Sequence, residues 1–343
     1  YPDDPVVITI SHLGYIKRTA LTEFREQSRG GVGSKGAHTR DEDFTEYIYP
    51  ATMHNTLLFF TQKGRCYWLK CYEIPEGAKN SKGRAIQNLL NIEADDAINA
   101  VLRIKNLNDK EFVDSHYVVF ATKNGIIKKT CLEAYSRPRA NGVNAINILE
   151  GDQVVGVRLT NGHNELLLAN RNGRAIRFNE EELRPMGRVS TGVRGMRLDG
   201  GDDEVVGLVC VNDPQTETIM VVSENGYGKR SDVDDYRKTA RGAKGVKTIS
   251  ITEKTGRLVA IKVVTDENDL MIINKSGILI RMKVADVRVM GRATQGVRLI
   301  NLTKKNDVIA SVCKVMTETE EEPETIVDPD ESPNVENTEN TEN

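Results

Sequence analysis

The sequence predicts an all-β protein: a six-bladed β-propeller-like toroid followed by a disordered acidic C-terminal tail. An apolar, β-branched run and a polar turn with glycine recur six times along the 343 residues. Stretches with the 3.6-residue period of an amphipathic helix are scarce, which argues against a helical solenoid. A lone blade of four short strands leaves two faces open, so we expect the blades to stack into one ring.

Each repeat opens with a run that we expect to form a strand. The six runs occupy residues 6–10, 57–60, 117–120, 166–168, 219–222 and 270–273. A turn glycine follows each run, at intervals of 50, 61, 48, 53 and 51 residues: Gly14, Gly64, Gly125, Gly173, Gly226 and Gly277. Three of these turns carry Asn-Gly, the strongest short signal for a β-hairpin, because both turn residues adopt positive φ.

A second glycine marks a later turn in every repeat. It lies 17 to 19 residues after the turn glycine in five repeats, and 22 residues after it in the first, where it is Gly36. The longest interval between repeats is explained by an inserted surface loop at residues 106–110. We therefore divide the toroid, residues 1–315, into repeats at approximately 1–53, 54–115, 116–164, 165–216, 217–268 and 269–315.

Charge divides the chain into two regions. Residues 316–343 hold eleven acidic side chains and no Lys or Arg, and their Glu-, Thr-, Asn- and Pro-rich composition predicts a disordered tail. The preceding residues, 1–315, hold 47 basic and 39 acidic side chains, so their formal charge is about +8. A basic body with an acidic tail is typical of a protein that binds a polyanion.

Basic residues recur at one phase of the repeats, which predicts a belt of positive charge around the ring. The fourth residue after the turn glycine is basic in five repeats and Trp68 in the other; the five are Arg18, Lys129, Arg177, Arg230 and Arg281. Three repeats add a Lys one position earlier: Lys17, Lys128 and Lys229. Further bases flank the second glycines: Arg188, Arg194, Arg241, Lys247, Arg292 and Arg298. Such a belt suits the phosphates of a duplex, which give affinity without sequence information, whereas a merely solvated strand face is the competing interpretation.

No motif for catalysis or metal binding is evident. The sequence lacks a Walker phosphate loop, a paired His-Glu metal motif and a nucleophile elbow, so we expect no catalytic residue. None of the five His residues pairs with one of the five Cys residues at ligand spacing, so we expect no metal site and buried thiols in a reducing cytoplasm. No apolar run approaches the ~18–20 residues of a membrane helix. The chain begins without Met or a signal-peptide profile, and we expect it to be part of a longer polypeptide.

The extra residues of the first repeat are rich in glycine. Segment 27–36 reads Gln-Ser-Arg-Gly-Gly-Val-Gly-Ser-Lys-Gly, in which glycine permits close approach to a phosphate while Arg29 and Lys35 supply charge. The segment resembles the glycine-rich box of the C-terminal domain of the DNA gyrase A protein, whose usual form is Gln-Arg-Arg-Gly-Gly-Lys/Arg-Gly. Ser28 and Val32 stand where that box has bases. The matching positions are Gln27, Arg29, Gly30, Gly31 and Gly33.

The resemblance covers residues 1–315, through all six repeats. It implies a β-pinwheel, a propeller whose neighbouring blades exchange strands, that wraps duplex DNA around its basic rim with positive handedness. In that family the wrap lets ATP-driven strand passage introduce negative supercoils. The resemblance further implies a cytoplasmic, non-catalytic domain without cofactors of its own, because ATP and magnesium are used elsewhere in the enzyme. Its partners would be duplex DNA and, in a heterotetramer, the rest of the gyrase A protein together with gyrase B, and the isolated domain would be monomeric and away from membranes.

Two other interpretations stay open. The related C-terminal domain of the topoisomerase IV A protein typically has fewer blades and a degenerate box, which six readable repeats and a first-repeat box disfavour. A propeller can also be a protein-interaction scaffold, but Trp-Asp repeat signatures are absent and a cationic belt suits DNA better. An enzyme built on a propeller needs convergent polar residues at the central channel, which the sequence does not locate.

Overall fold

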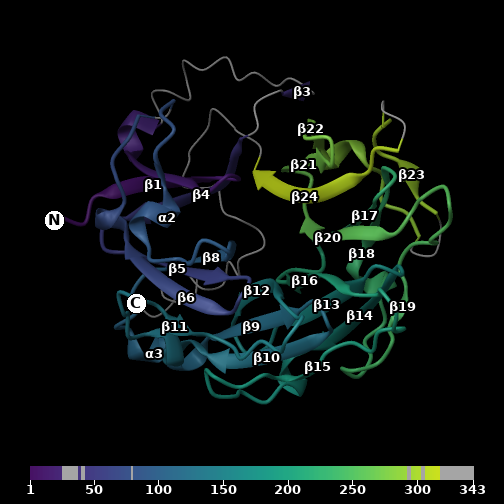
Figure 1. The fold of residues 1–343 in the computed structure, drawn as a ribbon, viewed down its shortest axis with the longest axis horizontal. Helices are drawn as coiled ribbons and strands as arrows, with labels where there is room; N and C mark the ends of the chain where they lie inside the picture. Colours follow the sequence, from purple (N-terminus) through teal and green to yellow (C-terminus); the bar gives the residue numbers. More distant parts are fainter. Residues whose placement is uncertain (25–37, 40–42, 79, 292–294, 303–305, 317–343) are drawn as a thin grey trace.

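The structure, a computed structural model, describes residues 1–24, 38–39, 43–78, 80–291, 295–302 and 306–316. Within these ranges the chain forms six four-stranded sheets, and Figure 1 shows them arranged as blades around a common axis. The predicted six-bladed, all-β fold is therefore confirmed. The predicted acidic tail lies outside the described residues except for Met316.

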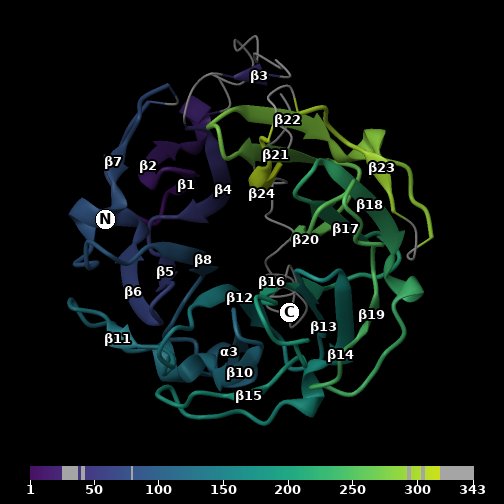
Figure 2. The same cartoon turned by 45° about the vertical axis from the view of Figure 1, so that its right-hand side comes forward.

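The blades share one order of strands from the axis outward (Figures 1 and 2). The innermost strands are β4 (Thr45–Thr52), β8 (Ile98–Ile104), β12 (Val154–Thr160), β16 (Val205–Val211), β20 (Leu258–Val264) and β24 (Ile309–Met316). The second strands are β1 (Pro5–Ser11), β5 (Thr56–Thr61), β9 (Tyr117–Thr122), β13 (Glu165–Asn170), β17 (Thr218–Ser223) and β21 (Asn268–Asn274). The third strands are β2 (Tyr15–Ala20), β6 (Arg65–Lys70), β10 (Ile126–Cys131), β14 (Arg174–Asn179), β18 (Tyr227–Asp232) and β22 (Leu279–Lys283). The outermost strands have two residues each: β7 (Arg84–Ala85), β11 (Val143–Asn144), β15 (Val193–Arg194), β19 (Val246–Lys247), β23 (Val297–Arg298) and β3 (His38–Thr39).

The outermost strand of every blade comes from the following repeat. Strand β7 follows β5 and β6 along the chain but pairs with β2 of the preceding blade, with Tyr15 opposite Ala85 and Ile16 opposite Arg84. The ring closes by the same rule, because β3 of the first repeat pairs with β22 of the last blade, and β3 lies outside β22 at the top of Figure 2. We call β3, β7, β11, β15, β19 and β23 the exchanged strands.

Short helical turns connect the third strands to the exchanged strands. Five 3-10 turns occur there: η1 (Cys71–Glu73), η2 (Leu132–Tyr135), η3 (Glu180–Glu182), η4 (Val233–Asp235) and η5 (Val284–Asp286). The α-helices α2 (Ile86–Leu89) and α3 (Lys110–Ser115) are short, and α3 begins at the end of the insertion predicted from sequence. Among the described residues no helix combines the length and the apolarity needed to cross a membrane.

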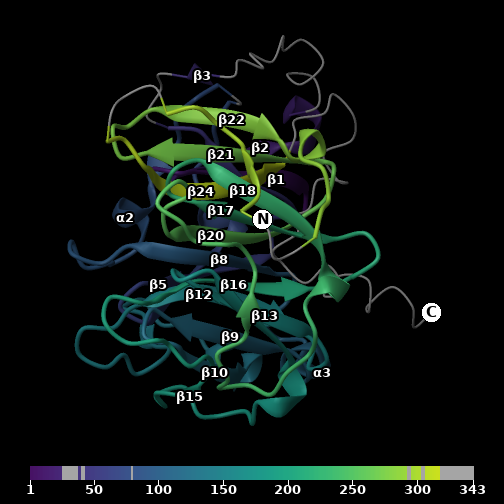
Figure 3. The same cartoon turned by 90° about the vertical axis from the view of Figure 1, so that its right-hand side faces the viewer.

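The apolar core lies between the blades, and it is uneven around the ring. Figure 3 shows successive blades from the side, with β21, β17 and β13 one below another. Five interfaces bury clusters of 11 to 18 apolar residues. At the sixth, between β1 and β4 of the first blade and β21 and β24 of the last, the described residues bury two separate clusters of three and four residues. We call this sixth interface the closing seam.

The second glycines precede the exchanged strands and press against the third strand of the neighbouring blade. Gly245 adopts a φ of +81°, and a Cβ atom there would lie 2.4 Å from the carbonyl oxygen of Ala175. That distance is far below van der Waals contact, and the oxygen belongs to a β-ladder that cannot move without losing pairing. The fixed spacing of these glycines in the sequence therefore reflects both the positive φ and the close approach of two backbones.

We predict that Gly245→Ala lowers the free energy of unfolding by about 2–4 kcal/mol, since it adds a steric clash to the strain of positive φ. Gly151→Ala is the matched control, because Gly151 has a φ of +78° but nothing within 4 Å of its Cβ position. Its cost should be about 1 kcal/mol, the strain of φ alone. Urea unfolding of both variants measures the difference, and equal costs would mean that the close approach is unimportant.

Candidate nucleic-acid interface

Basic side chains concentrate where each repeat crosses to the preceding blade. We call residues 75–85, 136–144, 184–194, 237–247 and 288–298 the crossover segments; each runs from a 3-10 turn to the end of an exchanged strand. These 53 residues contain 16 Lys or Arg and a single acid, Glu76. Fourteen of these bases are among the residues that the structure describes. Since the exchanged strands are the outermost strands of the blades, the described parts of the crossover segments place their charge on the outer edge of the ring.

The exchanged strands carry exposed bases on four blades. They are the second strand residue in β15, β19 and β23, which is Arg194, Lys247 and Arg298, and the first residue of β7, Arg84. Strand β11 has Asn144 as its second residue, but the register puts Arg65 opposite it, and Arg65 Nη1 donates to Asn144 Oδ1 at 2.9 Å. Each of these five blades therefore carries a basic group at the pairing site of its exchanged strand.

Two arginines of the crossover segments tie successive exchanged strands together. Arg188 Nη1 donates to the carbonyl oxygen of Asn144 at 2.5 Å, and Arg241 Nη1 donates to that of Arg194 at 2.9 Å. Arg188 and Arg241 are half-buried, so each guanidinium also reaches the outer surface. Arg292 stands at the equivalent place in the sequence but lies outside the described residues.

The bases of the third strands do not form the exposed belt expected from the sequence. Lys129, Arg177 and Arg230 are only 5–6% exposed, and Arg18 and Arg281 are half-buried. The physical reason is strand exchange: a crossover segment runs along the strands of Arg18, Lys129, Arg177 and Arg230. For example, the Lys129 carbonyl accepts from Met186 N at 2.7 Å. Neighbouring blades also cover the faces of the third strands. Side chains at the same position after the turn glycine are therefore buried to a similar extent in different blades.

The side chain at this position instead donates hydrogen bonds to carbonyl oxygens at the 3-10 turn of the next repeat, a contact that we call the clasp. Arg177 Nη1 donates to the carbonyl oxygens of Val233 and Tyr236, at 3.1 and 2.9 Å, at the two ends of η4. Arg230 makes the corresponding bonds to η5, to Val284 and Val287, both at 3.3 Å. The Val233 and Val284 carbonyls also accept the backbone bond that closes each turn, from Tyr236 N at 3.0 Å and from Val287 N at 2.9 Å. A guanidinium offers several donors in a fixed fork, so one side chain can bond both ends of a turn.

The same clasp explains the one repeat that lacks a base. Trp68 Nε1 donates to the carbonyl oxygen of Tyr135, at the end of η2, at 2.9 Å. Arg18 Nε likewise donates to Ile74 at 3.0 Å, and Lys129 Nζ to Glu180 at 3.3 Å. A nitrogen-borne donor is therefore what this contact requires, because a neutral indole can make it. The cations at this position also pair with acids, as Arg177 Nε does with Glu165 Oε2 at 3.4 Å. In the last repeat, Arg281 Nε donates to Asp269 of its own blade at 2.7 Å.

The lysines one position earlier are also internal. Lys17, Lys128 and Lys229 are 7%, 1% and 0% exposed. Lys128 Nζ donates to the carbonyl oxygens of Ala145 and Arg188, at 2.7 and 2.6 Å. Burial, with a smaller contribution from the Arg188 charge, lowers the pKa of Lys128 to about 7. These lysines donate to backbone carbonyls inside the ring and do not contribute to the basic outer surface.

The expected site residues thus fall into three groups. The structure places Arg188, Arg194, Arg241, Lys247 and Arg298 at the outer edge. It buries or half-buries the third-strand bases, as described above. The remaining positions lie outside the described residues: Gln27, Arg29, Gly30, Gly31, Gly33, Lys35 and Arg292. Sequence reasoning missed Arg84 and Arg65. The excess of basic over acidic residues in the segment that leads to and just passes each second glycine would have revealed Arg84.

The fold and edge together define a class: a propeller with exchanged outer strands and a basic circumference. The family model described as DNA gyrase C-terminal domain, beta-propeller matches residues 5–51, 55–105, 116–161, 164–212, 217–265 and 268–313. The chain therefore belongs to the family of DNA gyrase C-terminal domains.

Relatives and solved structures agree with that assignment. The DNA gyrase A protein of Staphylococcus aureus (strain MRSA252) is 44% identical over 323 residues, which is 94% of this chain and 36% of that protein. The chain thus spans about a third of the length of the curated relatives it matches. The C-terminal domain of DNA topoisomerase IV has a TM-score of 0.80 at 28% identity, covering 94% of this chain and 96% of that one. A DNA gyrase A C-terminal domain has a TM-score of 0.66 at 25% identity, covering 91% and 100%.

We predict that Lys128 makes stability rise with pH above neutrality. Its pKa is about 7 in the folded chain and about 10.4 when unfolded, so the unfolded chain binds more protons between these values. The free energy of unfolding should then increase by up to about 1.4 kcal/mol per pH unit. Lys128→Met removes this contribution, and urea unfolding of both proteins at about pH 7, 8 and 9 measures it. Parallel pH profiles would show that Lys128 stays charged when folded.

Proposed function

We propose that this chain binds duplex DNA along its outer edge, as the wrapping domain of a cytoplasmic DNA gyrase. The observation that carries the proposal is the composition of the crossover segments, whose described residues place 14 bases and one acid on the circumference of the ring. Lys and Arg that neutralise phosphates release counterions, which gives strong and largely sequence-independent binding. The membership in the gyrase C-terminal domain family supports DNA as the polyanion.

The ring geometry favours a curved path for the duplex. Exposed bases lie on successive exchanged strands, and Arg188 and Arg241 join two pairs of crossover segments into a continuous edge. Bending DNA through a full turn should cost on the order of 10–20 kcal/mol, extrapolating elastic estimates for shorter sites. Contacts spread over many blades can meet this cost, whereas a single patch cannot. In the whole enzyme, such a wrap would present DNA for strand passage by the rest of the gyrase A protein and by gyrase B, and so support negative supercoiling.

The topoisomerase IV domain is the second candidate, because its solved structure is similar to this ring at a TM-score of 0.80. DNA binding at the outer edge is common to both proposals, and trapped supercoiling separates them. Ligating a nicked plasmid in the presence of the chain should leave a linking difference if the duplex is wrapped. A protein-interaction scaffold would leave neither a linking difference nor strong duplex affinity.

We predict that removing exposed bases weakens DNA binding without weakening the fold. The fourfold variant Arg84→Gln, Arg194→Gln, Lys247→Gln and Arg298→Gln should lower duplex affinity, and each lost phosphate contact should reduce the log–log salt slope by about 0.9. Fluorescence anisotropy at several salt concentrations measures both quantities. An unchanged salt slope would exclude this edge as the DNA site.

Two buried arginines, Arg177 and Arg230, provide a control, because their removal also takes away positive charge but not from the outer edge. Arg177→Met and Arg230→Met should each lower the free energy of unfolding by about 2–4 kcal/mol, because the carbonyls at η4 and at η5 lose their guanidinium donor. Their salt slopes should stay close to that of the native chain while the variants are folded. Loss of salt slope in these variants alone would instead favour the belt on the third strands.

The box remains a proposal from resemblance, and it has its own test. With one anchor gone, one end of a wrap opens while the other contacts persist, so Arg29→Ala with Lys35→Ala should reduce the trapped linking difference far more than the affinity. Plasmid ligation and anisotropy on the same preparation give the two readouts. Proportional loss of both, or of neither, would show that residues 27–36 are not a dedicated anchor.

A further inference from the structure

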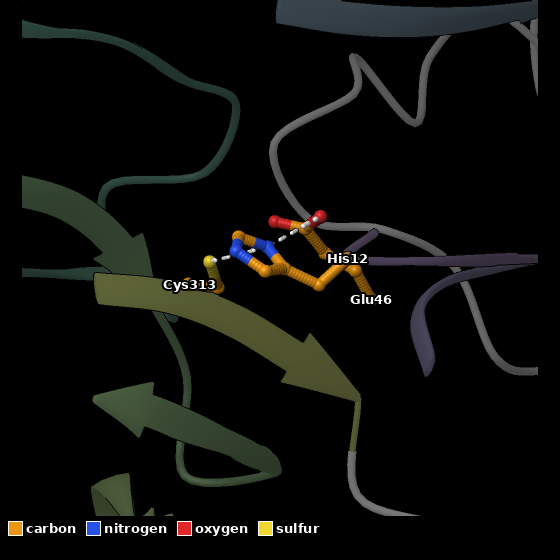
Figure 4. A group of neighbouring side chains, drawn as sticks. All are labelled: His12, Glu46 and Cys313. Carbon is orange, nitrogen blue, oxygen red and sulfur yellow. Dashed lines mark hydrogen bonds and ion pairs between the residues drawn. The ribbon is translucent and has the colours of Figure 1, made fainter. Parts of the chain in front are cut away.

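The closing seam brings together three potential metal ligands from opposite ends of the chain. His12 follows β1, Glu46 lies in β4, and Cys313 lies in β24 of the last blade. Figure 4 shows the imidazole of His12 between the carboxylate of Glu46 and the thiol of Cys313. One ligand atom from each residue lies within 4.8 Å of the other two. The residues are 34 and 267 positions apart, which is why ligand spacing along the sequence did not reveal them.

The separations between these atoms fit the edges of a tetrahedral metal site. His12 Nδ1 lies 3.4 Å from Glu46 Oε2 and 3.7 Å from Cys313 Sγ. A good N–H···O bond is shorter, at about 2.7–3.2 Å. In a tetrahedral zinc site, bond lengths of about 2.0–2.3 Å put neighbouring N and O ligands about 3.4 Å apart, and N and S ligands about 3.6 Å apart. The two measured separations therefore match two edges of such a tetrahedron.

The imidazole is also held in place by groups outside the cluster. The His12 backbone N–H donates to the carbonyl oxygen of Phe44 at 2.9 Å. The His12 ring stacks on the Phe44 ring, with centroids 4.9 Å apart and planes 10° from parallel. Phe44 packs in turn on the small cluster that contains Cys313. A fixed ring orientation lowers the entropy lost when a ligand atom binds a metal.

We propose that the closing seam is a binding site for a divalent transition-metal cation, with Zn²⁺ as the best fit, held by His12 Nδ1, a Glu46 carboxylate oxygen and Cys313 Sγ. Imidazole nitrogen, carboxylate oxygen and thiolate sulfur are the ligands that zinc uses in proteins. Binding forms three bonds to the cation and displaces the thiol proton to solvent, so no oxidant or reductant is required. The side chains of His12 and Glu46 are 30% and 18% exposed, which leaves a water molecule room to fill the fourth position.

A cation here would compensate for the thin apolar packing of the seam. The other five interfaces bury clusters of 11 to 18 apolar residues, whereas the described residues of the seam bury only the two small clusters. The bond to Cys313, in the innermost strand, would join the last blade to the first in addition to the pairing of β3 with β22 at the outer edge. The cation would therefore act as a clamp on ring closure, independent of whether the outer edge binds DNA.

The test uses the reduced full chain and needs no DNA. Titration with Co²⁺ should give the visible bands of tetrahedral cobalt and a near-ultraviolet sulfur-to-cobalt charge-transfer band, and Zn²⁺ should displace both and raise the melting temperature. Cys313→Ser should abolish the charge-transfer band, and His12→Gln should weaken cobalt binding by more than about tenfold. His12 is partly exposed, so this second variant keeps the test valid if Cys313→Ser folds poorly.

Cys131→Ser is the matched control, because Cys131 is the one cysteine that is not buried and ends β10, in a blade that does not border the seam. It should keep the spectrum, the affinity and the zinc-dependent stabilisation of the native chain. Absence of a sulfur-to-cobalt band in the native chain, or the same band in Cys313→Ser, would overturn the proposal. The cluster would then be an ion pair between His12 and Glu46 beside a buried thiol.

Discussion

The hydrogen bond from the fourth position of a hairpin to the next repeat, which is made in the first five repeats, is the interaction on which the ring depends. This bond joins a third strand to the 3-10 turn of the following repeat. It therefore fixes the point at which the crossover segment passes from its own blade to the preceding one. The crossover then runs along the third strand and supplies the exchanged strand, which has only two residues. A two-residue strand has little pairing of its own, and the clasp and the second glycine hold it in register.

This arrangement separates the cations of the chain into two populations. The inner population is buried, and carbonyl oxygens or acids saturate its donors, as with Arg177 between η4 and Glu165. A buried charge left without such partners would cost several kcal/mol, so each inner cation requires its specific acceptors. The outer population lies on the crossover segments, where solvent or a polyanion supplies the counter-charge. Cations of both populations occur within one hairpin and its crossover segment. Strand exchange decides which of them are buried and which are exposed.

That dependence sets the limit of what the sequence predicts. The number of blades, the hairpins and the all-β class follow from local signals, since Asn-Gly turns and apolar runs have the same meaning in any context. The exposure of Lys129 or Arg230 does not, because it is decided by a segment some 55–60 residues further along the chain. Trp68 carries the useful hint: a tryptophan at a supposedly cationic phase indicates a donor with an internal acceptor. The seam cluster is beyond any spacing argument, because ring closure alone brings Cys313 to His12.

Exchange of strands between neighbours has a consequence for how such rings evolve. Every repeat of about 50 residues contributes its exchanged strand to the blade of the preceding repeat, and its own blade receives the exchanged strand of the following repeat. An in-frame duplication or deletion of one whole unit therefore leaves each remaining blade with four strands and each clasp with its acceptor. Blade number, and with it circumference, can change in a single genetic step without a new edge to protect from aggregation. Only the junction between the first and last units must adapt, and it is the place where lineages with different ring sizes should diverge most.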